Sequence, residues 1–278
     1  MSDRPDIGLR GNLDLVCAWD PGRGTYLARQ SFSAPMHLSK AYSDGTTLLV
    51  NVVNQTAGIF GGDSIQTRVI IEPGARVLLS SPSAARFHAS QGRESRLEQT
   101  FHIRAGGCLD VFPEISIPQH ASRSFQKTAI HIEQGGELIY LETVTPGRVA
   151  SGEVFAFARY AWQTRIWVTN RLVHRECASI ASDNHSLAGL TGFFPASYYA
   201  GLIVISPGSE NWTLDFAHAV SSLGHPAALK IAASKLCSGG WSIRLVASDS
   251  LALRRGITEL RQLVYQYLGR SAPDSRRV

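Results

Sequence analysis

Acidic residues recur beside the turns that glycine and proline mark in this sequence. Carboxylate oxygens are ligands for divalent cations, and acids at the edges of turns can line a common water-filled passage. For each acid taken alone, a solvated turn residue is the alternative. The acids concerned are Asp63, Asp110, Glu114, Glu142 and Glu153.

The nine histidines show no local zinc signature, because none pairs at i,i+2 or i,i+4 and there is no HExxH motif. Nucleophilic catalysis has little support, since the chain lacks G-x-S-x-G and a cysteine in a nucleophile context. A metal-independent enzyme with Asp63 and His88 as acid and base remains one alternative.

A glycine-rich stretch, residues 54–63, combines three glycines, two large apolar residues and an acid. Glycine permits tight or left-handed backbone that a Cβ would resist, while Ile59 and Phe60 favour burial. The stretch is not a phosphate-binding loop, since no Lys-Ser/Thr follows and the next segment is strand rather than helix. We interpret it as a turn that closes a layer of strands. Its glycines are Gly58, Gly61 and Gly62.

The composition limits the class of protein. The 278 residues are 44% apolar, which suffices for a full core. A net charge of +5, spread along the chain, favours solubility or an acidic protein partner over nucleic acid. Four widely spaced cysteines are typical of reduced thiols. We expect a cytoplasmic protein with no signal peptide, membrane span or nucleic-acid partner.

A weak internal repeat is the clearest sign of organisation. Three segments follow a strand–turn–strand pattern, with turns at Gly74, Gly106 and Gly135, which are 32 and 29 residues apart. We interpret each segment as a hairpin, and we predict another around the turn at 169–170. Hairpins at this period predict stacked β layers, as in a β-helix or a β-sandwich.

Helix is expected only late in the chain. Residues 227–236, after Pro226, are a short candidate, and residues 251–268 are the stronger one, with apolar residues at three- and four-residue spacing. A strand is expected at 241–247. The sequence therefore predicts a mainly β, stacked-strand, β-helix-like single domain with two C-terminal helices. Its parts are a β-rich region (11–212), a helix-containing region (213–270) and a flexible tail (271–278).

Taken together, the motifs resemble those of a known family, the urease accessory proteins of the UreD (UreH) type. The likeness covers roughly residues 35–270 in order and spacing. It runs through the glycine-rich stretch 54–63 and the segments 73–75, 80–88, 109–117 and 146–153. It continues more weakly through 241–245 and the last helix.

The resemblance implies a scaffold without catalytic activity that binds apo-urease together with UreF- and UreG-type partners. It also implies that nickel passes through the protein to the urease active site and that no cofactor stays bound. A path of this kind needs ligands that never form a closed site, because a full inner sphere would trap the ion. The candidate path residues are Asp63, Glu153, Glu142, Glu114 and His88.

The family motifs also carry over to positions with a structural task, namely Gly58, Gly61, Gly62, Pro113, Arg148 and Gly152. An aromatic segment offers a candidate partner surface, with an ordinary core strand as its alternative. The residues of that segment are Phe193, Phe194, Tyr198 and Tyr199. A generic interaction module without a metal role is the remaining functional alternative.

Overall fold

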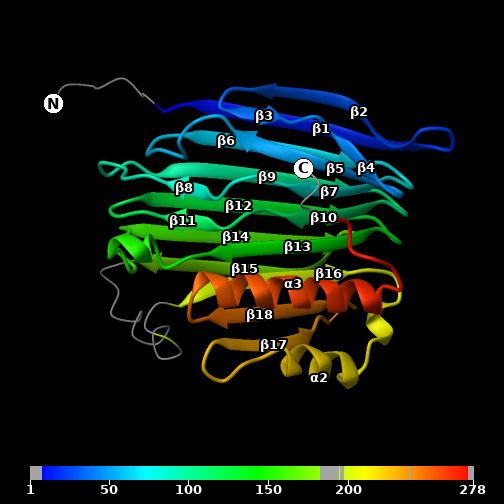
Figure 1. Cartoon of the computed structure of the whole chain (residues 1–278). Helices are drawn as coiled ribbons and strands as arrows, with labels where there is room; N and C mark the ends of the chain where they lie inside the picture. The colour runs from blue at the N-terminus through cyan, green and yellow to red at the C-terminus, as the bar shows by residue number, and fades with distance from the viewer. Residues whose placement is uncertain (1–7, 182–193, 195–196, 238, 275–278) are drawn as a thin grey trace.

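The computed structural model describes residues 8–181, 194, 197–237 and 239–274. Two β-sheets lie face to face, and the strands of each are stacked one above the next along the molecule (Figure 1). The two helices of the described residues lie toward one end of the stack. The predicted mainly β, stacked-strand fold with two late helices is confirmed.

The first sheet has seven strands, and its central strands are parallel. Their spatial order is β15 (Arg171–Ala181), β14 (Arg159–Val168), β12 (Arg123–Ile132), β9 (Ser95–Ile103), β6 (Ser64–Ile71), β1 (Arg10–Asp20) and β2 (Gly24–Ser33). The outermost pairs, β14 with β15 and β1 with β2, are antiparallel.

The second sheet has eleven strands. Along its main path lie β17 (Leu229–Lys235), β18 (Trp241–Ala247), β16 (Tyr198–Ile205), β13 (Glu137–Val144), β10 (Cys108–Phe112), β7 (Arg76–Ser80), β5 (Thr47–Asn54) and β3 (Met36–Leu38). Beside this path lie β4 (Tyr42–Asp44), β8 (Ala85–Phe87) and β11 (Ser116–Pro118).

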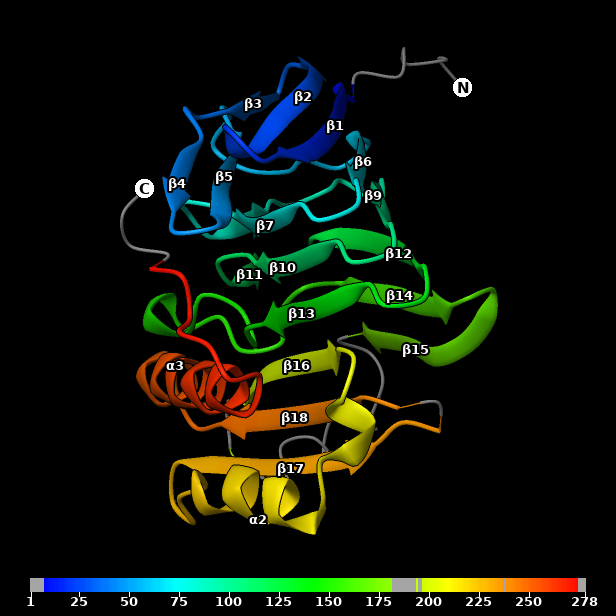
Figure 2. The ribbon, with the colours of Figure 1, turned by 90° about the vertical axis from the view of Figure 1, so that its right-hand side faces the viewer.

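The three glycine turns join the two sheets, so the predicted hairpins at these turns are wrong. At Gly74 the chain leaves β6 in the first sheet and enters β7 in the second, and each strand pairs in parallel with the next repeat. Successive turns stack by backbone hydrogen bonds, from Arg104 N to Ile71 O at 2.9 Å and from Glu133 N to Ile103 O at 2.8 Å. The predicted repeat is therefore a rung of a β-solenoid-like stack (Figure 2).

The hairpin predicted at residues 169–170 is confirmed. β14 and β15 pair in antiparallel, and Thr169 and Asn170 have φ of 46° and 65°. Two consecutive residues with positive φ are typical of the tight turn that matches the twist of a hairpin.

Two hydrophobic cores lie on opposite faces of the second sheet. The first fills the space between the sheets, and the second lies between the second sheet and the helices. Strand β13 contributes to both, since Leu138 and Tyr140 enter the first core while Ile139 and Leu141 enter the second. The alternation follows from the two-residue period of a strand.

The long helix α3 (Ser250–Tyr267) confirms the stronger helix prediction. The Asp249 side chain caps it by accepting from Ala252 N at 2.8 Å, and Gly269 follows with φ of 68°. Its apolar stripe is buried against the second sheet. Figure 2 shows α3 outside that sheet.

The shorter helix prediction, at residues 227–236, is wrong. That segment is β17, in which Leu229 is buried and Lys230 exposed in the alternation of a strand. The second helix is instead α2 (Leu214–Ser222), where Phe216 and Val220 are buried one turn apart. The strand predicted at 241–247 is confirmed as β18.

Short 3-10 turns and the chain end complete the description. The turns are η1 (Val149–Ser151) and η2 (Ser209–Asn211). Of the tail expected at 271–278, Pro273 O accepts from Arg261 Nη1 at 3.0 Å and Asp274 N donates to Asp44 Oδ2 at 3.0 Å. Residues 275–278 lie outside the described residues.

A buried ion pair fastens α3 to the outer face of the second sheet. Arg261 Nη2 lies 2.5 Å from Asp110 Oδ2, and Tyr265 OH donates to the same oxygen at 2.7 Å. Both charged side chains are nearly inaccessible to solvent, with exposures of 8% and 2%. Asp110, one of the turn acids singled out by the sequence, thus has a structural partner.

We expect Asp110→Asn to lower the free energy of unfolding by about 3 kcal/mol, because removal of one member leaves the buried Arg261 charge unpaired. Urea unfolding followed by tryptophan fluorescence measures the loss. Glu133→Gln is the matched control, since it breaks the exposed pair of Glu133 with Arg104, and it should leave the unfolding midpoint nearly unchanged. Equal effects of the two variants would contradict the assignment.

Candidate functional site

A cavity of about 310 Å³ lies between the two sheets. Apolar residues of the first core form much of its wall, including Leu79, Phe101 and Val111. Polar side chains from both sheets also face it. These are Thr67, Gln99, Gln126, Tyr140 and Glu142, with Glu114 and Ser116 from the loop and strand that follow β10.

Glu142 is the buried carboxylate of this cavity. It occupies an inward position of β13, so the strand alternation that buries Leu138 and Tyr140 also directs Glu142 toward the first sheet. Its oxygens accept from Gln126 Nε2 at 2.8 Å and from Thr164 Oγ1 at 3.3 Å. Burial, together with the negative charge of Glu176, raises the pKa of Glu142 to about 8.

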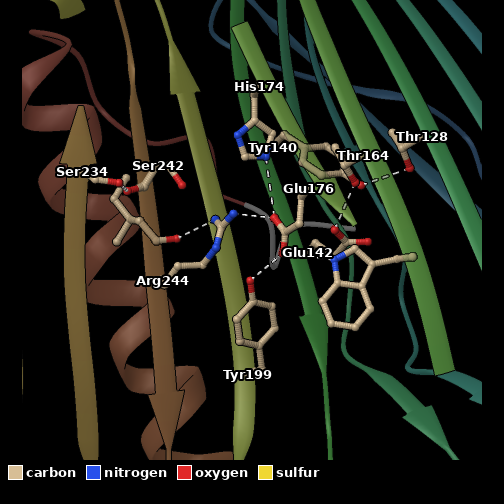
Figure 3. A network of polar contacts seen from close by, with 12 residues as sticks. Thr128, Tyr140, Glu142, Thr164, His174, Glu176, Tyr199, Ser234, Ser242 and Arg244 are labelled. Carbon is tan, nitrogen blue, oxygen red and sulfur yellow. Dashed lines mark hydrogen bonds and ion pairs between the residues drawn. The ribbon is translucent and has the colours of Figure 1, made fainter. Parts of the chain in front are cut away.

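A second carboxylate, Glu176 on β15, lies in a different environment (Figure 3). Its Oε1 accepts from Tyr199 OH at 2.9 Å and from Trp162 Nε1 at 3.1 Å, and its Oε2 is bonded to Arg244. His174 Nε2 lies 3.6 Å from Oε2. Burial alone would raise the pKa of Glu176, but these donors and the Arg244 charge hold it below the ordinary value.

The two carboxyl groups therefore differ in charge at neutral pH. Glu142 retains its proton and is uncharged, whereas Glu176 is ionised and paired. A cation that binds Glu142 must displace that proton, so the affinity of Glu142 for a cation should rise with pH. Without a cation, Glu142 is therefore neutral. When a cation binds and the proton leaves, the Glu142 carboxylate becomes a charged ligand.

Hydroxyl and amide groups extend the polar wall away from Glu142. Tyr140 OH donates to Thr128 Oγ1 at 3.3 Å, and Thr128 Oγ1 donates to Gln99 Oε1 at 3.0 Å. Gln99 and Tyr140 face the cavity from opposite sheets. Neutral oxygens of this kind can solvate an ion without holding it tightly.

Of the five predicted path residues, Glu142 and Glu114 line this cavity. Glu114 is half-buried and follows β10 directly after Pro113. Its Oε2 lies 2.7 Å from Arg254 Nη2 of α3, and its backbone nitrogen donates to Ser81 Oγ at 2.9 Å.

Asp63 is buried at the end of the glycine-rich stretch and is bonded to backbone. One carboxylate oxygen accepts from Leu9 N at 2.9 Å, and the other accepts from Phe60 N at 2.8 Å. The carboxylate therefore ties the stretch to the segment that leads into β1. This contact gives Asp63 a structural task.

His88 lies beside the glycines of the same stretch. Its ring stacks on Phe60 with the centroids 4.5 Å apart, and its Nε2 is 3.1 Å from Ala57 O. A Cβ added at Gly58 would lie 2.4 Å from Arg86 O, and one at Gly61 would lie 2.6 Å from Ser90 Cα. These glycines permit backbone to pack directly on backbone, and Gly62 has φ of 93°.

Glu153 belongs to a third location, at the turn after β13. Its Oε2 accepts from Arg148 Nε at 2.9 Å and from His120 N at 3.1 Å. The hydrogen bond from the Arg148 guanidinium holds the pKa of Glu153 below its ordinary value, and the His120 backbone contact acts in the same direction, whereas burial opposes both. Gly152 ends η1 with φ of 78°. The structure therefore does not bring Glu153 together with Glu142.

The aromatic segment predicted as a partner surface is core where the structure describes it. Phe194 and Tyr198 are each 8% exposed, and Tyr199 is bonded to Glu176. Phe193 lies outside the described residues. The alternation of β16 places Tyr198 in the second core and packs Tyr199 against the first.

Sequence reasoning missed Glu176 and its partner Arg244. The available signal was in the hairpin strand β15, where Glu176 takes the same face as the core-packed residues Ala178 and Ile180. Arg244 is likewise a single basic residue within the apolar strand β18. An isolated charge inside an apolar strand indicates a buried pair.

Within the described ranges, no group of three or more His, Cys, Asp or Glu side chains is arranged to hold a metal ion. No helix in the described part of the chain is long and apolar enough to cross a membrane.

Comparison with known proteins gives a consistent result over nearly the whole chain. Residues 9–278 match the family model described as UreD urease accessory protein. A urease accessory protein UreD from Opitutus terrae is 34% identical over 275 residues, which cover 98% of this chain and 100% of the relative. Another from Deinococcus radiodurans is 31% identical over 273 residues, covering 95% and 92%.

We expect Glu142→Gln to stabilise the protein at pH 7 by about 3 kcal/mol, but to have little effect near pH 4.5. The folded state holds the Glu142 proton up to about pH 8, whereas an unfolded glutamate releases it near 4.5, so the wild type loses stability between these values. Urea unfolding at a series of pH values measures the difference.

Glu176→Gln is the matched control with the opposite sign. The pKa of Glu176 is lowered in the folded state. Its ionised carboxylate therefore stabilises the folded protein at neutral pH, and this stabilisation is lost in acid. This variant should be less stable than the wild type at pH 7, and the difference should shrink as the pH falls. A pH-independent difference for Glu142→Gln would show that Glu142 is ionised in the folded protein.

Proposed function

Because the chain belongs to the UreD family of urease accessory proteins, we propose that it is a scaffold that helps to deliver nickel to apo-urease. The family has a role in urease maturation and is not a family of catalytic enzymes. This membership removes the alternative of an enzyme that uses Asp63 and His88. The proposed partners are apo-urease and accessory proteins of the UreF and UreG types, and the proposed location is the cytoplasm.

The observation that carries the proposal is the polar-lined cavity between the sheets, with Glu142 in its wall and Glu114 at its edge. A nickel ion in transit is a cargo, so it needs oxygen ligands that replace part of its hydration without enclosing it. One buried carboxylate among hydroxyl and amide groups meets that requirement. Nickel would enter as the Glu142 proton leaves.

Asp63, Glu153 and His88 stay candidates for the same path. Both carboxylates make backbone contacts that order loops, so their alanine variants separate two roles. Lower urease activation with an assembled complex would place Asp63 or Glu153 in the path. Loss of assembly would make them structural.

We expect Glu142→Gln to lower nickel loading and activity of co-expressed urease by about tenfold, while the complex with urease and the accessory proteins still forms. Glutamine keeps the size of the side chain but removes the ionisable ligand. Nickel content by atomic spectroscopy, urease activity and co-purification provide the three readouts.

Glu133→Gln is the control, since Glu133 is an exposed turn residue paired with Arg104. It should leave all three readouts unchanged. A generic interaction module without a metal role predicts full nickel loading with Glu142→Gln. Full loading when this chain is omitted altogether would overturn the maturation role itself.

A further inference from the structure

A surface groove of about 540 Å³ lies between α3 and the outer face of the second sheet. Residues of α3 form one side, among them Arg254, Arg255 and Ile257, and the ends of β7 and β10 form the other. The groove lies on the opposite face of the sheet from the interior cavity, since it is lined by the outward residues Asn51 and Phe112.

The groove and the interior cavity share part of their lining. Six residues belong to both, namely Ser80, Ser81, Pro113, Glu114, Leu141 and Thr143. Here β7 and β10 end, and pairing resumes only at β8 and β11. Pro82 and Pro113 lie in the two connecting segments and cannot donate to a strand ladder. The sheet is therefore interrupted where the two spaces meet.

The Arg254–Glu114 ion pair lies at this meeting point. Glu114 belongs to the shared lining, and its Oε2 lies 2.7 Å from Arg254 Nη2. The two side chains are 55% and 32% exposed, so solvent screens the pair and little free energy is needed to part it. While it is closed, the guanidinium occupies the Glu114 carboxylate and repels an approaching cation.

The location of Arg254 favours an exchangeable contact. Arg254 and Arg255 lie in the second turn of α3, toward its N-terminal end, so the helix dipole does not stabilise either guanidinium. Glu114 supplies the compensating charge to Arg254. A cation at Glu114, or an anion at Arg254, would therefore open the pair readily.

We propose that the Arg254–Glu114 ion pair is a charge gate that controls cation passage between the interior cavity and the groove under α3. This inference rests on the proposed nickel passage and names the ion pair that would control movement of the cation along it. Opening transfers no bond or electron: Arg254 moves off the carboxylate, and a hydrated divalent cation takes its place.

Thiol labelling of the full-length chain tests the gate without urease. Val111→Cys, in a background where the exposed Cys177 and Cys237 are serine, places a reporter that lines the cavity but not the groove. The remaining Cys17 and Cys108 are buried, and burial raises the pKa of each thiol to about 12, so both should be inert. Ser116→Cys serves as a second reporter.

We expect Arg254→Gln to speed labelling by a cationic methanethiosulfonate about two- to fivefold, the population change that follows loss of an exposed ion pair. Labelling by a neutral methanethiosulfonate should change less. Arg255→Gln is the matched control, because it removes the same charge from the same groove but leaves Glu114 paired. Equal rates for wild type and Arg254→Gln at both reporters would overturn the gate.

Co-expression with urease at limiting nickel separates the gate from the passage. Arg254→Gln should keep or increase nickel loading. Glu114→Gln removes the carboxylate ligand as well as the ion pair, so it should lower nickel loading. If labelling follows the prediction but neither variant changes nickel loading, the result supports the charge gate and contradicts the nickel passage. If Glu142→Gln lowers nickel loading but Arg254→Gln does not change labelling, the result supports the nickel passage and contradicts the charge gate.

Discussion

Backbone hydrogen bonds between stacked turns hold the strands of this protein in register, and the remaining features depend on that register. Each rung donates to the rung before it, as from Glu133 to Ile103, so β6, β9 and β12 in the first sheet and β7, β10 and β13 in the second stay parallel and aligned. A shift of one residue would exchange the inward and outward faces of a strand. Glu142 would then face α3 instead of the cavity. The position of the interior carboxylate is thus a consequence of turn stacking.

Burial and pairing divide the charged groups into two kinds. Asp110 and Glu176 are each buried against an arginine and form part of the framework. Glu142 is buried beside hydroxyl and amide donors alone, and it avoids the cost of a buried charge by keeping its proton. Only the second kind can exchange its proton for a cation without breaking the structure. This difference is the physical basis for proposing Glu142 as a residue of the nickel path.

Much of the fold could be predicted from the sequence, because period and turn chemistry are local signals. The repeat of glycine turns, the α3 stripe and the hairpin at Thr169 all belong to this class. Whether a strand folds back or crosses to another sheet depends on distant partners, so the rungs were predicted as hairpins. Of the site, Glu142 and Glu114 were named, but Glu176 and Arg244 come from segments 68 residues apart that only folding brings together.

The stacked architecture also sets how the interior space can change in length. Each rung contacts only its neighbours, and adjacent strands lie about 4.8 Å apart. An insertion or deletion of one whole repeat would therefore lengthen or shorten the space by one such step while leaving its cross-section unaltered. The length of the interior space is in this sense counted in rungs, so it can change only in discrete increments.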